Sequence, residues 1–183
     1  PRHECNHSPP GVTRLAKTLD SYSPTHHRYE FSEALCDTST PGCTVEAAYA
    51  ALQRHAVPGG PQPGIPIMNG KRSPVSPFFI PGGHVRTYVE PENRSIVNVT
   101  EPDHRYTRGL VLRQIAVDGD KIVVRTYGEG NNQTPQLAAQ NRILGRAAFV
   151  VSTEAMRTEL KSSTENGNWY DRAPGMNNAP KHN

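Results

Sequence analysis

The sequence predicts an α+β fold: short N-terminal helices, then a curved antiparallel β-sheet of four or five strands, with one or two helices after it. Three observations support this prediction. Apolar residues recur at helical spacing in two segments before residue 57. Residues 84–127 contain four short segments with strand-like alternation, and residues 134–144 return to a helical pattern. Helices that are separated from consecutive strands in this way are typical of α+β domains.

The composition indicates one domain with a modest core. The chain has 183 residues, of which 34% are hydrophobic, and it contains 17 Pro and 15 Gly. No stretch reaches the roughly 18 apolar residues that a membrane span needs, so we expect none. The chain begins with Pro1 rather than Met, and we therefore expect it to derive from a longer polypeptide.

Changes in composition divide the chain into four predicted parts. Residues 1–57 form an N-terminal helical part, and residues 58–83 form a Pro/Gly-rich loop that wraps around the core. Residues 84–161 form the sheet core with flanking helices. Residues 162–183, rich in Asn, Gly and Ser, form a partly disordered tail.

Two helices are expected before the sheet. The first begins at Ser8-Pro9-Pro10 and ends near Asp20, with an apolar stripe of Val12, Leu15, Ala16 and Leu19. Residues 21–40 are polar, and we expect them to be irregular. Thr44 then caps a second helix over residues 45–55, whose stripe is Val45, Ala48, Tyr49 and Leu52.

The three cysteines leave two interpretations open. Cys36 and Cys43 are close enough in sequence to form a disulfide, which would leave Cys5 unpaired. A bridge would indicate an oxidising compartment, whereas free thiols would indicate the cytosol. The spacing matches no zinc-binding pattern.

The predicted strands cover residues 84–89, 95–100, 110–117 and 121–127, and Asp118-Gly119 forms the turn of the last hairpin. After the sheet, Thr134-Pro135 begins a helix that runs to about Leu144. Residues 146–151 are expected to add a strand, and residues 153–161 a last helix.

The net charge of +3 is concentrated in one part of the chain. Residues 104–127 contain three more basic than acidic residues, and the rest of the chain is balanced. A local basic surface favours partners that carry phosphate. The alternative is that these are solvated arginines that protect sheet edges from pairing.

The residue types near the predicted sheet suit metal-independent cleavage of RNA. No phosphate-binding loop, zinc motif or nucleophile elbow is found, so we expect no metal and no cofactor. Histidine can donate or accept protons near neutral pH, and arginine binds phosphate oxygens. The predicted catalytic residues are His104, His84, Thr126 and Tyr127, and the predicted substrate-binding residues are Arg108, Arg113, Arg125 and Glu129.

Each of these residues also has a structural explanation. His104 follows Pro-Asp and suits an ordinary turn, and Thr126 suits an ordinary strand. The arginines could instead form salt bridges with Asp118, Asp120 or Glu129. Arg113 and Arg125 could also lie on opposite faces of the sheet.

Two segments resemble a known group of toxins. They read P-D-H-R-Y-T-R-G-L-V-L-R over residues 102–113 and V-V-R-T-Y-G-E-G over residues 123–130. Their layout resembles the C-terminal toxin domains of bacterial polymorphic and contact-dependent systems, in particular the barnase–EndoU–colicin–RelE group of ribonucleases. The resemblance implies a secreted ribonuclease on a larger carrier polypeptide. It also implies delivery to the cytoplasm of a target cell and neutralisation by a cognate immunity protein.

Two other functions stay open at this point. The first is an ADP-ribosyltransferase or NAD-glycohydrolase toxin, for which Arg86, Tyr88 and Glu129 would be the residues of interest. The second is a secreted binding module without enzymatic activity, whose loops contact a carbohydrate or a protein.

Overall fold

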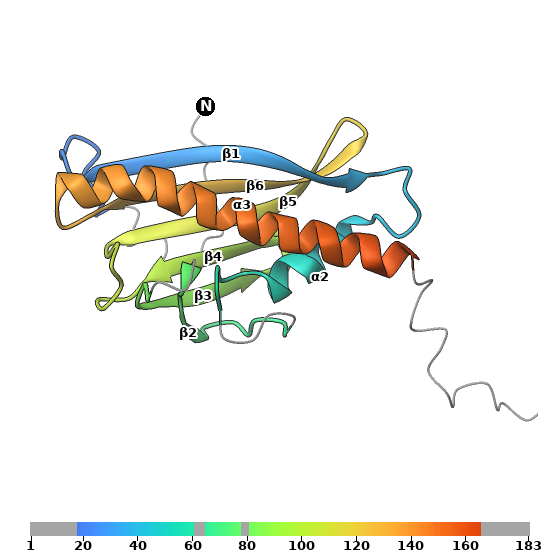
Figure 1. Cartoon of the computed structure of the whole chain (residues 1–183), viewed down its shortest axis with the longest axis horizontal. Coiled ribbons are helices and arrows are strands. Elements are labelled where there is room, and N and C mark those ends of the chain that lie inside the picture. The colour runs from blue at the N-terminus through green and yellow to red at the C-terminus, as the bar shows by residue number, and fades with distance from the viewer. Residues whose placement is uncertain (1–17, 61–64, 78–80, 166–183) are drawn as a thin grey trace, which may run out of the picture.

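A computed structural model describes residues 18–60, 65–77 and 81–165 of the chain. Figure 1 shows a curved sheet with one long helix lying across it. The six strands are β1 (His26–Asp37), β2 (Arg72–Pro74), β3 (His84–Glu90), β4 (Ser95–Thr100), β5 (Gly109–Asp118) and β6 (Lys121–Asn131). All neighbouring pairs are antiparallel, in the order β1-β6-β5-β4-β3-β2. The α+β class and the antiparallel sheet are confirmed, although the sheet has six strands rather than four or five.

Strand β1 is the first departure from the prediction, which treated residues 21–40 as irregular. It is twelve residues long and pairs with β6 from His26↔Asn131 to Asp37↔Lys121. Its inward residues include Tyr29, Phe31 and Leu35, and they alternate with exposed polar residues. The many charged side chains of an edge strand with one solvated face concealed this period of two.

The other long strands match the predicted segments closely. β3, β4 and β5 agree with the expected ranges to within one residue at each end. β6 continues to Asn131, four residues beyond the predicted end, and so includes Gly128 and Gly130. The β5–β6 hairpin turns at Gly119 and Asp120, and Gly119 has a φ of 60°, in the left-handed region that favours glycine.

Helix α2 (Val45–Arg54) confirms the predicted second helix. Its N-cap is Thr44, whose hydroxyl accepts a hydrogen bond of 3.0 Å from the amide of Ala47. The short 3-10 helix η2 (Pro91–Asn93) connects β3 to β4.

Helix α3 (Pro135–Glu165) replaces the predicted helix, strand and helix with one continuous element. Its start agrees with the prediction, since the hydroxyl of Thr134 accepts from the amide of Leu137 at 3.2 Å. The expected strand at residues 146–151 is wrong. Buried positions recur at intervals of three, four or seven residues, which keeps them on one face of a single helix, and they are Ala138, Asn141, Ala148, Phe149, Ser152, Thr153, Met156 and Leu160. A short Val/Phe-rich run cannot be assigned to strand or helix by its own periodicity.

Several predicted features lie partly outside the described residues. Cys5 and most of the first predicted helix belong to residues 1–17, and the end of that helix, residues 18–20, is not helical. In the Pro/Gly-rich segment, β2 was not predicted. Ile67 packs against the core there, whereas Ile65 and Met68 are exposed.

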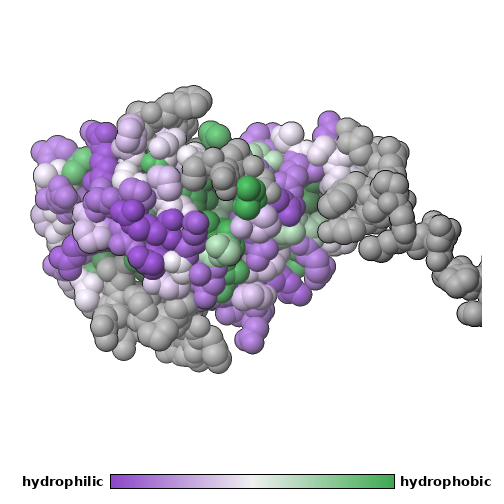
Figure 2. All heavy atoms as spheres, turned by 90° about the horizontal axis from the view of Figure 1, so that it is seen from below, coloured by the Kyte–Doolittle hydropathy of each residue, from purple (hydrophilic) through white to green (hydrophobic). Residues whose placement is uncertain are grey.

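Figure 2 shows hydrophobic residues gathered in the middle of the face seen from below, between more hydrophilic areas.

The main hydrophobic core occupies one half of the molecule. It is formed by Leu35, Cys43, Ala48, Ala51, Leu52, Ala56, Ile96, Ile115, Ile122, Val124, Met156 and Leu160. These residues come from α2 and the loops on either side of it, the C-terminal half of α3 and the strands that face them. A disulfide between Cys36 and Cys43, with Cα atoms 6.1 Å apart, joins the end of β1 to the loop before α2. Within the described ranges, no helix is long and apolar enough to cross a membrane.

Candidate functional site

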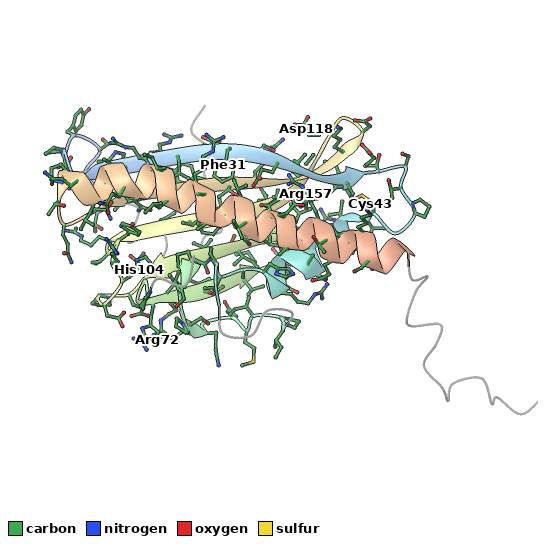
Figure 3. All side chains as sticks on the ribbon, viewed as in Figure 1. Phe31, Cys43, Arg72, His104, Asp118 and Arg157 are labelled. Carbon is green, nitrogen blue, oxygen red and sulfur yellow. A yellow bond between two sulfur atoms is a disulfide. The ribbon has the colours of Figure 1, made fainter. Side chains whose placement is uncertain are left out.

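The other half of the molecule contains a cavity between α3 and the concave face of the sheet. Its volume is about 110 Å³. Figure 3 shows His104, which lines it, at the end of the sheet opposite Cys43 and Asp118. The cavity is lined by His27, Tyr29, Pro58, Val75, Pro77, Pro81, Gly82, Val85, Asn98, Thr100, His104, Arg105, Tyr106, Gly109, Leu110, Val111, Asn141, Leu144, Gly145, Ala148 and Phe149. Most of these contribute apolar surface, which is typical of small-molecule sites.

Glycines make room for the large side chains around this cavity. A Cβ at Gly128 would lie 2.2 Å from Cζ of Tyr29, and one at Gly130 would lie 2.7 Å from Cε1 of His27. On α3, a Cβ at Gly145 would lie 3.1 Å from the hydroxyl of Tyr29. The Tyr29 and His27 side chains therefore lie directly against the β6 backbone at Gly128 and Gly130, and Tyr29 also lies close to α3 at Gly145.

His104 is a neutral hydrogen-bond donor in the cavity wall. It lies in the loop between β4 and β5 and is 8% exposed. Burial lowers its pKa to about 4, so the imidazole carries no charge at neutral pH. Its Nδ1 accepts a hydrogen bond of 3.0 Å from the amide of Tyr106. The ring proton of the neutral form therefore lies on Nε2.

A second neutral histidine, His27 of β1, also lines the cavity. His27 is 3% exposed, and burial, followed by the neighbouring His26, lowers its pKa to about 4. Its Nε2 lies 2.7 Å from Nδ2 of Asn141 on α3, and its Nδ1 has no partner among the described residues. Burial also raises the pKa of the Tyr29 hydroxyl beside it. These groups can offer hydrogen bonds to a ligand without carrying charge.

His84, predicted as the partner of His104, lies at the rim and does not line the cavity. Its Nδ1 is 2.7 Å from Oδ2 of Asp103, which also accepts from Arg72 at 2.9 Å. The hydrogen bond from His84 lowers the pKa of Asp103. Gly83, at φ 86°, lies directly against the loop between β4 and β5. A Cβ at this position would be 2.3 Å from the carbonyl oxygen of Asp103.

Arg113, predicted to bind phosphate, is completely buried and joins the sheet to α3. Its guanidinium donates to the hydroxyls of Ser152 and Thr153, both at 2.8 Å. The hydroxyl of Thr153 lies 2.8 Å from Glu33 of β1. Burial lowers the pKa of Arg113 to about 10, so it stays charged at neutral pH. Because it is buried among these partners, it is not available to a substrate on the surface.

Three other predicted residues lie on the convex face. Arg125 pairs with Gln114 across the hairpin and is exposed, whereas Arg113 pairs with Thr126 and faces α3. The Tyr127 hydroxyl donates to Glu129, and Nε2 of His26 lies 2.9 Å from the same carboxylate. Arg113 and Arg125 are therefore on opposite faces and cannot bind one phosphate.

The remaining predicted residues are dispersed. Thr126 is buried against α3, and its hydroxyl has no partner within the described part of the chain. Arg108 lines a separate polar pocket of about 500 Å³ and reaches the carbonyl of Thr18 at 3.5 Å. Of the alternative set, Arg86 binds Glu101 at 2.8 Å, and Tyr88 packs in an apolar cluster on the convex face.

The structure thus brings only one of the eight predicted site residues, His104, to the cavity. The prediction did not include His27, Tyr29, Asn141 or Phe149, which come from β1 and α3. No local motif in the sequence marks them. In the described ranges, no group of three or more His, Cys, Asp or Glu side chains could hold a metal ion.

Comparison with known proteins gives a fold but no family. No family model and no curated protein matches the sequence. Solved structures of other proteins share the fold of this chain at low sequence identity.

The chain shares its fold with two aromatase/cyclases. It is similar to an aromatase/cyclase from a Streptomyces species, with a TM-score of 0.58 and 11% identity over 78% of this chain and 99% of that one. It also resembles the di-domain aromatase/cyclase of the steffimycin biosynthetic pathway, with a TM-score of 0.55 and 10% identity over 78% of this chain and 53% of that one. A major latex family protein of Arabidopsis thaliana gives a TM-score of 0.50 and 15% identity over 79% of this chain and 99% of that one.

These likenesses overturn the predicted ribonuclease toxin of a contact-dependent system, because the structures that share the fold are aromatase/cyclases and a latex protein. The physical reason lies in the placement of the residues. The expected basic, histidine-bearing surface does not form, since Arg113 is buried, Arg125 lies on the other face and His104 lines an apolar cavity. Delivery to a target cell, the immunity protein and the carrier stay predictions.

Proposed function

We propose that this protein binds an apolar small molecule between α3 and the concave face of its sheet. The observation that carries the proposal is the cavity itself, which is formed by one end of the fold while the other end is filled by the main core. Packed protein interiors leave few voids larger than a water molecule, so a lined cavity of this kind indicates a binding site.

The polar groups of the wall support the same proposal. His27 and His104 are neutral at pH 7, and each is hydrogen-bonded through one ring nitrogen. A ligand with an aromatic or alicyclic body and a few oxygen atoms matches such a wall, because apolar surface provides affinity and a few polar groups fix orientation. The likeness to aromatase/cyclases is compatible with a ligand of this kind.

The test is to fill the cavity from within and measure binding of a neutral fluorescent probe, N-phenyl-1-naphthylamine. Val111 lines the cavity, and Leu112, the next residue of β5, points to the convex face. We expect the wild type to bind the probe with micromolar affinity. Val111→Phe should weaken binding by about tenfold or more, since the ring occupies the ligand's space.

Leu112→Phe is the matched control, because it adds a ring of the same kind to the opposite face of the same strand. It should leave probe affinity within about twofold of the wild type. Circular dichroism would verify that both variants are folded. Equal affinity of the two variants, or no binding by the wild type, would refute the proposal.

A further inference from the structure

One permanently charged side chain lines the described part of the cavity wall, and it is Arg105. Its backbone amide donates to the carbonyl of Gly82, another lining residue, at 2.8 Å. We call this exposed edge of the cavity wall, at Gly82 and Arg105, the mouth. The Arg105 guanidinium carbon lies 5.9 Å from the centre of the Tyr106 ring, a distance that permits a cation–π interaction. The side chain is exposed, so an entering ligand can reach it.

The acidic residues around the mouth are bound to other arginines. Asp103 accepts from Arg72 at 2.9 Å, and Glu101 accepts from Arg86 at 2.8 Å. No carboxylate of the described residues forms a salt bridge with Arg105. Of the three arginines Arg72, Arg86 and Arg105, Arg105 is the one without a carboxylate partner among the described residues, and it is also the one that lines the cavity.

His104 and Arg105 both lie near the Tyr106 ring, whose centre is 6.1 Å from the His104 ring centre and 5.9 Å from the Arg105 guanidinium carbon. The His104 side chain is 8% exposed, and its protonated Nε2 has no acceptor among the residues that the structure describes. Nε2 is not one of the fully buried unpaired atoms, so a bound ligand can reach it and accept its proton. A guanidinium and an N–H beside it match the single charge and the two oxygens of a carboxylate.

We propose that the ligand of this cavity is an apolar carboxylic acid whose carboxylate binds the Arg105 guanidinium and Nε2–H of His104. This inference rests on the proposed function, because it assigns a chemical class to the molecule in the same cavity. The apolar body lies against Val111, Ala148 and Phe149, and the carboxylate lies at the mouth.

The test compares two probes that differ in charge alone, 2-naphthoate and 2-naphthamide, by isothermal titration calorimetry. The wild type should bind the carboxylate about tenfold more tightly, since hydrogen bonds to a charged group are about twice as strong as neutral ones. Arg105→Gln should remove this preference by weakening carboxylate binding about tenfold, and it should leave amide binding within about twofold.

Arg125→Gln is the matched control, with the same change of net charge on the convex face, and it should preserve the preference. Equal binding of both probes by the wild type, or an equal effect of the two substitutions, overturns the carboxylate assignment. If N-phenyl-1-naphthylamine still binds in a manner sensitive to Val111→Phe, the cavity proposal survives that result. If none of the three probes binds, both proposals fail.

Discussion

At the scale of single residues, burial decides what the two histidines of the cavity wall, His27 and His104, can do. The sequence led us to expect that His104 would exchange protons near neutral pH, and it does line the candidate site. Its pKa of about 4 makes it a neutral donor instead. The sequence could not show this, because the shift depends on how deeply the β4–β5 loop is buried.

These buried histidines predict a loss of stability in mild acid. His27 and His104 have folded-state pKa values of about 4, against 6.5 for an ordinary histidine. Between these values the unfolded chain binds protons that the folded chain does not, so the free energy of unfolding falls as the pH falls from 6.5 to 4. Each histidine should contribute about 3 kcal/mol, because its pKa is lowered from 6.5 to about 4 and each pKa unit corresponds to about 1.4 kcal/mol.

Urea denaturation at a series of pH values measures this loss. His104→Asn keeps a neutral acceptor for the amide of Tyr106 but cannot titrate, so its stability should depend less on pH in this window. Asp103 and Glu129, whose carboxylates have lowered pKa values, lose their contribution to stability at lower pH, below the ordinary pKa values of such groups. Identical slopes for the variant and the wild type between pH 6.5 and 4.5 would refute the assignment.

At the scale of elements, one buried arginine connects α3 to the sheet. Arg113 connects β5 to Ser152 and Thr153, and through Thr153 to Glu33 of β1. Arg113→Ala should lower the free energy of unfolding by about 3–5 kcal/mol, because it empties the space of a completely buried side chain and removes its hydrogen bonds to Ser152 and Thr153. Arg125→Ala, at an exposed position, should cost no more than about 0.5 kcal/mol in the same denaturant titration. Similar losses for the two variants would contradict this role.

A glycine on the same helix gives a second prediction. In an exposed helix, Gly→Ala stabilises by about 1 kcal/mol. At Gly145 the new Cβ would lie 2.6 Å from Oδ1 of Asn141, whose amide nitrogen is 2.7 Å from His27. We therefore expect Gly145→Ala to destabilise the protein by about 1–2 kcal/mol.

Thermal unfolding followed by circular dichroism would check the sign of this change. Ala139→Gly, at an exposed position of α3, is the control. It measures the ordinary difference in stability between alanine and glycine in this helix, which should be about 1 kcal/mol. A stabilised Gly145→Ala would show that Asn141 can move aside without cost.

The elements that could be predicted are those with a clear local signal. Thr44 and Thr134 mark helix starts by their capping hydroxyls, and the strands of residues 84–127 alternate plainly. β1 was missed because its outward face is charged, and α3 was divided because Phe149 and its neighbours form a short apolar run. Both errors concern elements whose identity depends on what they pack against.

At the scale of the whole molecule, the fold separates a filled half from a hollow half. The disulfide of Cys36 and Cys43, α2 and the main core stabilise the filled half, so the hollow half can keep a cavity. The candidate site was only partly predictable, because it is assembled from distant segments of the chain. Residues 27, 104 and 141 are far apart in sequence and meet only because β1 pairs with β6 and α3 crosses the sheet.

The bridge also bears on where the protein works. A disulfide forms and persists in an oxidising compartment, which agrees with the expectation that the protein is secreted. That location stays a prediction.

The pairing of β1 with β6 has a consequence for how the chain acquires this structure. The register joins His26 to Asn131, so the first strand finds its partner only after the segments of the other four have been synthesised. α3 follows all six strands in the sequence, and until it is made only α2 covers part of the concave face. Contacts between such distant segments slow folding. We therefore expect the nascent sheet to expose its apolar face to chaperones until the last helix has left the ribosome.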